Sequence, residues 1–540
     1  MAGSGRKRSS GGNLIISSSI LALAQIIVRF IGLFYRVPLQ HIVGDEGVGY
    51  YGFTFQIYQV ILLLSANAIP IAVSLLVSKN LASRQYKNVW RIFKGSLVFA
   101  AIVGGLFSLL VLFGAKGLAV ALFNQPNVAP SLRVIAPAIF VAAVMGVFRG
   151  FFQGKGAMLP TAISQIIEQI FNAVISVVAA YLLIVKGPAY GAAGSTLGTL
   201  TGALAGLVFV MIVFWAYKPT LMRVVRRDKD SKEDKYGHII RVVSLTMAPI
   251  ILSSTIYQIS GIVDSTLYSK ILYHLGYDPA VTASLYGIYT GQYQVIFNVP
   301  LGIASSIGIA LVPMITRAVV KGDIANINAK ISSVLRLTMI IALPCAVGLA
   351  ALATPIMQML FGANTSVSIS LLRLGGVAIV LYSFSTVTIA LLQGLNKLHA
   401  PVIDAAIALA VHIVFMVVLL VFCDMNIYSL IYGNAIFAFV MCVLNLRSLK
   451  KATGYVQEYL KTLIIPLVVS LIMGGITYFV YKGLYYVMHR NLIPTIIAII
   501  VGVVVYGIVI VVFGGVDEEE LLYIPKGRFF VKIFKKFKVM

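Results

Sequence analysis

Apolar stretches long enough to cross a bilayer dominate the chain, and short polar segments separate them. A transmembrane helix needs about 20 consecutive apolar residues, and by this measure the sequence predicts about fourteen helices. We place them at residues 13–39, 48–77, 92–114, 129–152, 160–185, 190–216, 241–269, 282–315, 331–356, 366–393, 400–423, 427–446, 462–484 and 491–514. The predicted fold class is therefore all-α, in a polytopic membrane protein.

Lysine and arginine collect in alternate connections, as cytoplasmic loops require. They follow the second, fourth and sixth predicted helices and continue in the same alternation to the C-terminal tail. Among them, Arg149 and Lys155 are assigned to the loop after the fourth helix. Both termini are therefore expected in the cytoplasm.

An internal repeat with a shift of about 235 residues organises the chain. Tyr51-Gly52 and Tyr58-Gln59-Val60-Ile61 return as Tyr286-Gly287 and Tyr293-Gln294-Val295-Ile296. Because each repeat holds six spans, both copies enter the membrane in the same direction. Two parallel six-helix bundles of this kind are typical of an alternating-access carrier.

The repeat predicts five segments along the chain. They are an N-terminal six-helix lobe (1–216), a basic cytoplasmic linker (217–240), a C-terminal six-helix lobe (241–450), two additional transmembrane helices (451–514) and an amphipathic basic tail (515–540). The tail interleaves lysine with phenylalanine, which predicts a short interfacial helix on anionic membrane lipids. A partner-protein site is the alternative interpretation of the tail.

Composition agrees with a membrane location and narrows the partners. The 540 residues are 60% hydrophobic and 11% charged, with a formal net charge of +25. In a soluble domain this charge would suggest nucleic acid, but here it lies in loops, so orientation and anionic lipid explain it better. No nucleic-acid partner is expected, and the three cysteines lie in apolar runs without metal-ligand spacing.

The first predicted helix carries two arginines, Arg29 and Arg36, inside an otherwise apolar stretch. Each costs about 2.5–3.5 kcal/mol to insert, so it should face a polar cavity or a partner. Seven residues separate them, which places both on one helix face. The pair suggests a path for an anion. Alternatively, one arginine extends to the interface or pairs with a buried carboxylate.

Other polar residues within the predicted spans are candidates for lining a cavity or coupling transport to a cation. The cavity candidates are Tyr58, Gln59, Glu168, Tyr293 and Gln294; those for a coupling cation, Na⁺ or H⁺, are Asp264, Asp404 and Asn434. Pro70 and Pro300 interrupt the second and eighth spans at matching places and are candidate hinges. The alternative interpretations are that Asp264 pairs with Arg29 as a gate and that Asp404 is a satisfied core carboxylate.

Catalytic and nucleotide-binding motifs are absent from the sequence. The histidines are scattered, no nucleophile motif occurs, and no Gly-Lys-Ser/Thr follows the glycines of the sixth span. The protein is therefore not expected to be an enzyme. We expect no cofactor and no metal beyond a possible Na⁺, with transport driven by gradients or membrane potential.

Four stretches carry a family resemblance. Arg29-Phe-Ile-Gly-Leu-Phe-Tyr-Arg36, the turn from Ile42 to Tyr51, Gln153-Gly154 and the segment from Asp517 to Gly527 resemble the polysaccharide-export branch of the multidrug/oligosaccharidyl-lipid/polysaccharide (MOP) superfamily. Within it, the chain is most similar to the stage V sporulation protein B and YtgP group, relatives of the lipid II flippase MurJ. The resemblance covers nearly the whole chain.

This resemblance implies a fourteen-helix flippase in a bacterial cytoplasmic membrane, and we expect the protein to be monomeric. Its substrate would be an undecaprenyl-pyrophosphate-linked oligosaccharide, either the peptidoglycan precursor lipid II or another cell-wall or sporulation intermediate. By position, Arg29 and Arg36 would meet the pyrophosphate, Asp264 and Asp404 would serve a sodium site, and the last two helices would hold the lipid tail. The chain departs from lipid II flippases in having Tyr-Gln pairs instead of arginine in spans two and eight.

Two other hypotheses compete with a flippase. A cation-coupled multidrug exporter of the same fold would be expected to carry carboxylates, not arginines, in its cavity. A non-transporting membrane scaffold would use its basic tail to recruit partners. Replacing both arginines with alanine distinguishes a scaffold from a flippase, since a scaffold would retain its function and a flippase would lose it.

Overall fold

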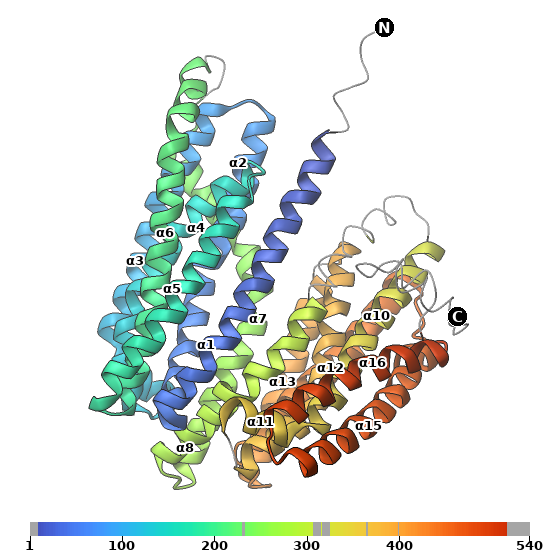
Figure 1. Ribbon diagram of the computed structural model, residues 1–540. Coiled ribbons are helices and arrows are strands. Elements are labelled where there is room, and N and C mark those ends of the chain that lie inside the picture. The colour runs from blue at the N-terminus through green and yellow to red at the C-terminus, as the bar shows by residue number, and fades with distance from the viewer. Residues whose placement is uncertain are drawn as a thin grey trace. The chain divides into compact units, whose positions relative to one another are not determined.

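The computed structural model describes residues 9–228, 233–305, 315, 324–362, 365–397 and 399–515, and these residues contain helices and no strand (Figure 1). The all-α prediction is confirmed. Eleven helical segments in this part of the chain are long and apolar enough to cross a membrane. This number is consistent with fourteen spans. The longest segment, Leu23–Ala82, covers two predicted helices. The predicted span 241–269 contains residues whose side chains the structure does not describe, and the predicted span 282–315 contains residues 306–314, which lie outside the description.

A glycine turn separates the first two predicted spans. Helix α1 (Ser9–Leu62) is interrupted at Gly44, whose φ of 72° and ψ of 173° lie outside the helical region. Glycine adopts a positive φ without the steric cost that a Cβ brings. After Leu62 the chain continues through a π-helical segment, η1 (Leu63–Asn67), into α2 (Ala68–Ala82).

The described chain divides into two compact units, residues 1–291 and 292–540. The first unit continues with α3 (Tyr86–Phe123), α4 (Ala129–Gly154), α5 (Leu159–Leu183), α6 (Pro188–Arg227), α7 (Tyr236–His274) and α8 (Pro279–Gly287). Its main core joins five helices, α2, α3, α4, α6 and α7, around buried apolar side chains that include Ile69, Phe93, Phe151, Phe214 and Val243.

The two copies of the Tyr-Gly repeat motif pack against each other within the first unit. A Cβ on Gly52 of α1 would lie 2.8 Å from Thr290 Oγ1 and 3.0 Å from the Tyr286 ring, and a Cβ on Gly287 would overlap the Asp45 carbonyl. This packing explains why α8 groups with the N-terminal helices, and α7 joins them through its contacts with α1, α2 and α3. The repeat-based division at residue 241 stays a prediction, because a repeat follows sequence similarity and a compact unit follows packing.

Helices α5 and α6 lie in backbone contact along the first unit (Figure 1). A Cβ added at Gly194 or Gly202 of α6 would lie 2.5 Å from a main-chain oxygen of α5, and one added at Gly198 would overlap Ser176. Glycines at every fourth position form one flat face on a helix, which lets the neighbouring backbone approach.

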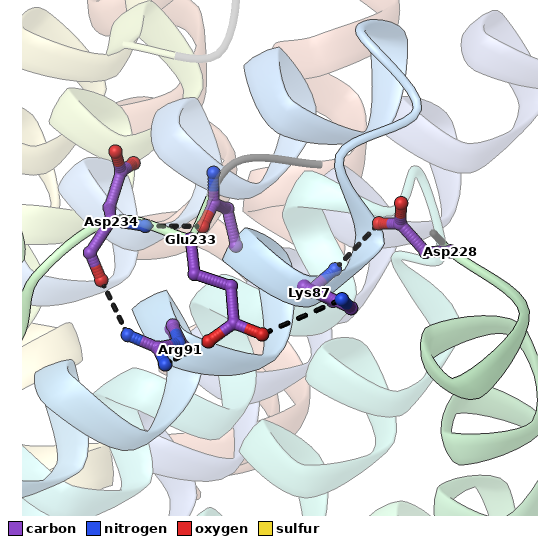
Figure 2. A network of polar contacts seen from close by, with 6 residues as sticks. Lys87, Arg91, Asp228, Glu233 and Asp234 are labelled. Carbon is purple, nitrogen blue, oxygen red and sulfur yellow. Dashed lines mark hydrogen bonds and ion pairs between the residues drawn. The ribbon is translucent and has the colours of Figure 1, made fainter. Parts of the chain in front are cut away.

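Acidic residues of the predicted basic linker bind the start of α3 (Figure 2). Lys87 lies in the first turn of α3, where its main-chain N–H donates to Asp228 Oδ2 at 3.0 Å and its Nζ lies 3.5 Å from Glu233 Oε1. Arg91 pairs with Glu233 and donates to the Asp234 carbonyl at 2.8 Å. The linker therefore packs on the first unit.

The second unit begins within a π-helical segment, η4 (Ile288–Tyr293), and helical residues 294–305 follow. Its helices are α10 (Ile324–Ala351), α11 (Ala353–Phe361), α12 (Ser366–Gly394), α13 (His399–Val421), α14 (Tyr428–Thr453), α15 (Ile465–Met488) and α16 (Leu492–Val512), with the π-helical segment η5 (Leu460–Ile464) before α15. The last two helices contact α10 through a core that includes Ile340, Val469, Met473 and Ile510.

A polar cluster holds the segment before α15 against α10. Arg336 Nη2 in α10 lies 3.2 Å from Glu458 Oε2, and the Asn328 amide donates to the Thr453 carbonyl at 3.1 Å. The Tyr455 hydroxyl, buried beside this pair, donates to Gln457 Oε1 at 3.0 Å. Burial raises the pKa of Tyr455 above its ordinary value. The predicted interfacial tail, from residue 516 onward, lies outside the described residues.

Candidate functional site

Arg36 is a partly buried cation in α1. Its guanidinium hydrogen-bonds the phenol oxygens of its neighbour Tyr35 and of Tyr51, which follows the Gly44 turn. The turn brings Tyr51 back beside Arg36 because the two parts of α1 run past each other. Neutral phenol oxygens satisfy the arginine without cancelling its charge, so an anion can still bind to it.

Arg29 lies two turns before Arg36 on the face of α1 that meets α5. On that face, Gln25 Nε2 donates to Gln165 Oε1 at 3.0 Å, and a Cβ on Gly32 would lie 3.5 Å from Gln169 Nε2. These contacts bracket Arg29 and place it level with residues 165–169 of α5. Its side chain is exposed and has no ion-pair partner among the described residues.

Glu168 of α5 forms an ion pair that the sequence analysis missed. Its Oε2 lies 2.7 Å from Arg149 Nη2 of α4, and the Arg149 Nε donates to Ser164 Oγ at 2.8 Å. Counting Arg149 with the loop charges is wrong, because it lies inside the predicted fourth span, 129–152, and inside α4, which continues to Gly154. Gly-Phe-Phe after the arginine was the available signal, since an apolar run after a charge indicates that the helix has not ended.

Tyr58 connects this ion pair with the Arg36 cluster. The buried Tyr58 phenol lies within electrostatic range of Glu168 and of Tyr51. The polar face therefore runs from Arg36 through the two tyrosines to Glu168, with Arg29 on the neighbouring turns of α1. We call the side chains of Arg29, Arg36, Tyr51, Tyr58 and Glu168 the cationic face of the first unit.

The remaining candidates of the first unit are Gln59, Pro70 and Asp264. Gln59 is partly buried on α1. Pro70 lies in α2 directly after the π-helical segment η1, where its missing N–H leaves the Ala66 carbonyl without its usual helical donor. Asp264 is buried in α7 near the phenol of Tyr286. Roles as hinge and cation ligand stay predictions.

Asp404 and Asn434 of the second unit form hydrogen bonds at different positions along α14. Asp404 Oδ2 accepts from Ser448 Oγ at 2.9 Å, whereas Asn434 Oδ1 accepts from the Tyr382 hydroxyl at 2.7 Å. Ser448 and Asn434 are both in α14, so at 1.5 Å per residue the two contacts lie about 21 Å apart along that helix. One cation cannot bind both. No group of three or more His, Cys, Asp or Glu in the described chain could hold a metal ion.

The second copy of the Tyr-Gln motif packs inside the second unit. Tyr293 is buried against α12, where a Cβ on Gly375 would overlap its ring, and its ring centroid lies 5.4 Å from that of Phe297. Gln294 is partly buried and Pro300 is buried within continuing helix. The proposal that Tyr293 and Gln294 line a cavity stays a prediction.

The two all-helical units and the candidate spans define a multi-pass membrane protein. The family model described as polysaccharide biosynthesis protein matches residues 15–319, and a second model with the same description matches residues 279–370. The chain belongs to this polysaccharide biosynthesis protein family, which agrees with the resemblance in the sequence.

Curated relatives in Bacillus subtilis (strain 168) match most of the chain. The lipid II flippase MurJ is 25% identical over 486 residues, which cover 85% of this chain and 87% of that protein. Stage V sporulation protein B is 24% identical over 509 residues, covering 94% and 96%. These relatives are consistent with a bacterial cytoplasmic membrane protein.

Solved structures share the fold. One described as lipid II flippase MurJ in an inward closed conformation matches with a TM-score of 0.64 and 18% identity, covering 92% of this chain and 98% of the other. An inward-facing multidrug resistance MATE family transporter of the MOP superfamily matches with a TM-score of 0.66 and 15% identity, covering 80% and 99%. The described chain therefore shares the fold of these two structures.

Proposed function

We propose that this protein is a flippase that exports an undecaprenyl-pyrophosphate-linked oligosaccharide from the inner to the outer leaflet. Lipid II or a related cell-wall intermediate is the proposed substrate. Family membership and likeness to a lipid II flippase and to a sporulation protein support the proposal. The observation that carries it is the placement of Arg29 and Arg36 on one face of α1.

Arginine suits this task physically. Its planar guanidinium forms forked, charge-assisted hydrogen bonds with phosphate oxygens. Arg36 has neutral phenol partners and Arg29 is exposed, so neither cation is cancelled by a carboxylate in the described chain. The two charges offset the cost of moving a pyrophosphate into a low-dielectric region. An inside-negative potential would then assist export by about 2.3 kcal/mol per charge for each 100 mV.

Coupling to Na⁺ or H⁺ belongs to the same proposal. Asp264 lies in the first unit and Asp404 in the second, each in a separate polar environment. We treat them as separate candidate sites, and Asn434 as a third. Binding of a cation to either acid would give the carrier a means of resetting after substrate release.

The arginine pair provides the test. We expect the double variant Arg29→Ala/Arg36→Ala to lose at least ten-fold in the rate of lipid II translocation, measured in proteoliposomes. Arg373→Ala is the matched control and should translocate normally, since this exposed α12 arginine donates to the neutral Thr354 hydroxyl at 3.1 Å and has no ion-pair partner among the described residues. Wild-type translocation by the folded double variant would contradict the proposal.

A cation-coupled multidrug exporter is the second candidate, supported by the likeness in fold to a MATE transporter. Such an exporter should confer resistance to cationic drugs, and cells lacking the protein should become sensitive to them. Under our proposal, depletion instead makes a lipid-linked precursor accumulate in the inner leaflet without a change in drug sensitivity. If the protein is a scaffold, cells that carry only the Arg29→Ala/Arg36→Ala variant should show neither drug sensitivity nor precursor accumulation.

A further inference from the structure

The Arg149–Glu168 pair holds an arginine in a defined orientation beside the cationic face. Ser164 Oγ donates to the Thr161 carbonyl at 3.0 Å, which leaves its lone pairs to accept from Arg149 Nε at 2.8 Å. The other edge of the guanidinium meets Glu168 Oε2 at 2.7 Å. One edge of Arg149 is thus fixed by a serine and the other is occupied by a carboxylate.

The two partners differ in exposure. The Arg149 side chain is 12% exposed, whereas that of Glu168 is 32% exposed. The Glu168 backbone is tightly held, since a Cβ on Gly202 of α6 would lie 2.5 Å from its carbonyl oxygen. Displacement of the carboxylate is therefore a movement of the Glu168 side chain toward its exposed side. A carboxylate that leaves in this way regains hydration, whereas the more buried Arg149 needs another acceptor in its place.

We propose that Arg149 is a third phosphate-binding group, and that Glu168 occupies its position until the diphosphate of the substrate replaces the carboxylate. This inference rests on the proposed function. Carboxylate and phosphate both accept the forked pair of N–H bonds that arginine offers, so the exchange keeps Arg149 satisfied. Tyr58, which lies within electrostatic range of Glu168, can donate its O–H to the displaced carboxylate.

The position of Arg29 supports this exchange. Arg29 is level with residues 165–169 of α5, the segment that carries Glu168. A diphosphate that binds Arg29 is therefore brought to the level of the Arg149–Glu168 pair. The carboxylate in turn repels anions that bind too weakly to displace it, which makes Glu168 a specificity-determining residue.

Binding of a polyprenyl diphosphate without sugar, measured in nanodiscs, tests the inference. We expect Glu168→Gln to tighten binding by several-fold, because the amide competes less well for Arg149. Arg149→Met/Glu168→Met should weaken it at least ten-fold while thermal unfolding stays close to wild type, since apolar replacement of a buried pair is often tolerated. Arg149→Lys, which keeps the charge without the fork, should bind with intermediate affinity.

A purely structural ion pair would give different results. Glu168→Gln would then bind no more tightly than wild type, and the folded double methionine variant would keep wild-type affinity; either result overturns the inference. Glu458→Gln, which alters the Arg336–Glu458 pair of the second unit, is the matched control and should not change affinity. If Arg29→Ala/Arg36→Ala weakens binding and the methionine variant does not, only this inference fails. If the alanine variant also binds and translocates normally, the proposed function fails.

Discussion

The guanidinium of Arg91 in α3 donates to the main-chain carbonyl of Asp234 at 2.8 Å and also pairs with Glu233 (Figure 2). The Asp234 N–H in turn donates to Asn88 Oδ1 at 3.0 Å. The end of the linker is thus held on the first two turns of α3 from both its main chain and its side chains. This contact fixes the start of α7, which begins at Tyr236.

We expect Arg91→Ala to release this end of the linker. The charged side chains are partly exposed, so the loss in unfolding free energy should be no more than about 1 kcal/mol and should shrink at high salt. Trypsin cleavage after Lys235 should become several-fold faster at low salt. Lys79→Ala, outside this network, should not change the rate. Equal cleavage of the Arg91 variant and wild type would contradict the assignment.

Gly198→Ala should destabilise the first unit. Its Cβ would overlap Ser176 Oγ and lie 2.5 Å from the Ser176 nitrogen, so α5 and α6 must separate. Overpacking of this kind typically costs about 1–3 kcal/mol. Thermal unfolding in detergent measures the effect, and Gly117→Ala in α3 is the control because nothing lies within 4 Å of its added Cβ. A wild-type melting temperature for Gly198→Ala would contradict the close packing.

Alkaline pH should weaken the contact around Tyr455. Its pKa is raised in the folded state by burial, so the folded protein holds the phenol proton more tightly than the unfolded chain. The stabilisation is complete below the ordinary tyrosine pKa and is lost as pH rises through the higher folded value. Tyr455→Phe should show a shallower fall of the melting temperature above about pH 10 than wild type. Parallel curves would show that Tyr455 does not contribute.

Asp404→Asn should remove the dependence of translocation on the coupling cation if Asp404 is its ligand. Asn434→Ala should leave that dependence intact, because its contact lies about 21 Å from that of Asp404 along α14. Transport with and without an imposed Na⁺ or H⁺ gradient measures the effect. Retained gradient dependence in Asp404→Asn would restrict this carboxylate to its hydrogen bond with Ser448.

The sequence predicted the helices well because bilayer-spanning runs are long and apolar, and the turn at Gly44 falls between two of its predicted spans. It also singled out Arg29, Arg36, Tyr58 and Glu168, since charge and polarity within such runs are costly. Their roles in transport remain predictions.

The sequence did not predict which helices pack together. Arg149 was assigned to a loop, because a count of cationic residues cannot tell a helix end from the loop beyond it. Its partnership with Glu168 depends on how α4 meets α5, which no local pattern specifies. The linker was judged by its net charge, so the pairing of its few carboxylates with Lys87 and Arg91 was missed.

The meeting of Gly52 with Tyr286, and of Gly287 with the backbone near Asp45, has an evolutionary consequence. When a half-length ancestor pairs through a two-fold axis, one surface of each subunit contacts the same surface of the other. Duplication and fusion of such a gene would convert that dimer interface into a contact inside one polypeptide. After such an origin each copy of the motif would pack against the other, so substitutions at Gly52 or Gly287 should be compensated in the opposite copy.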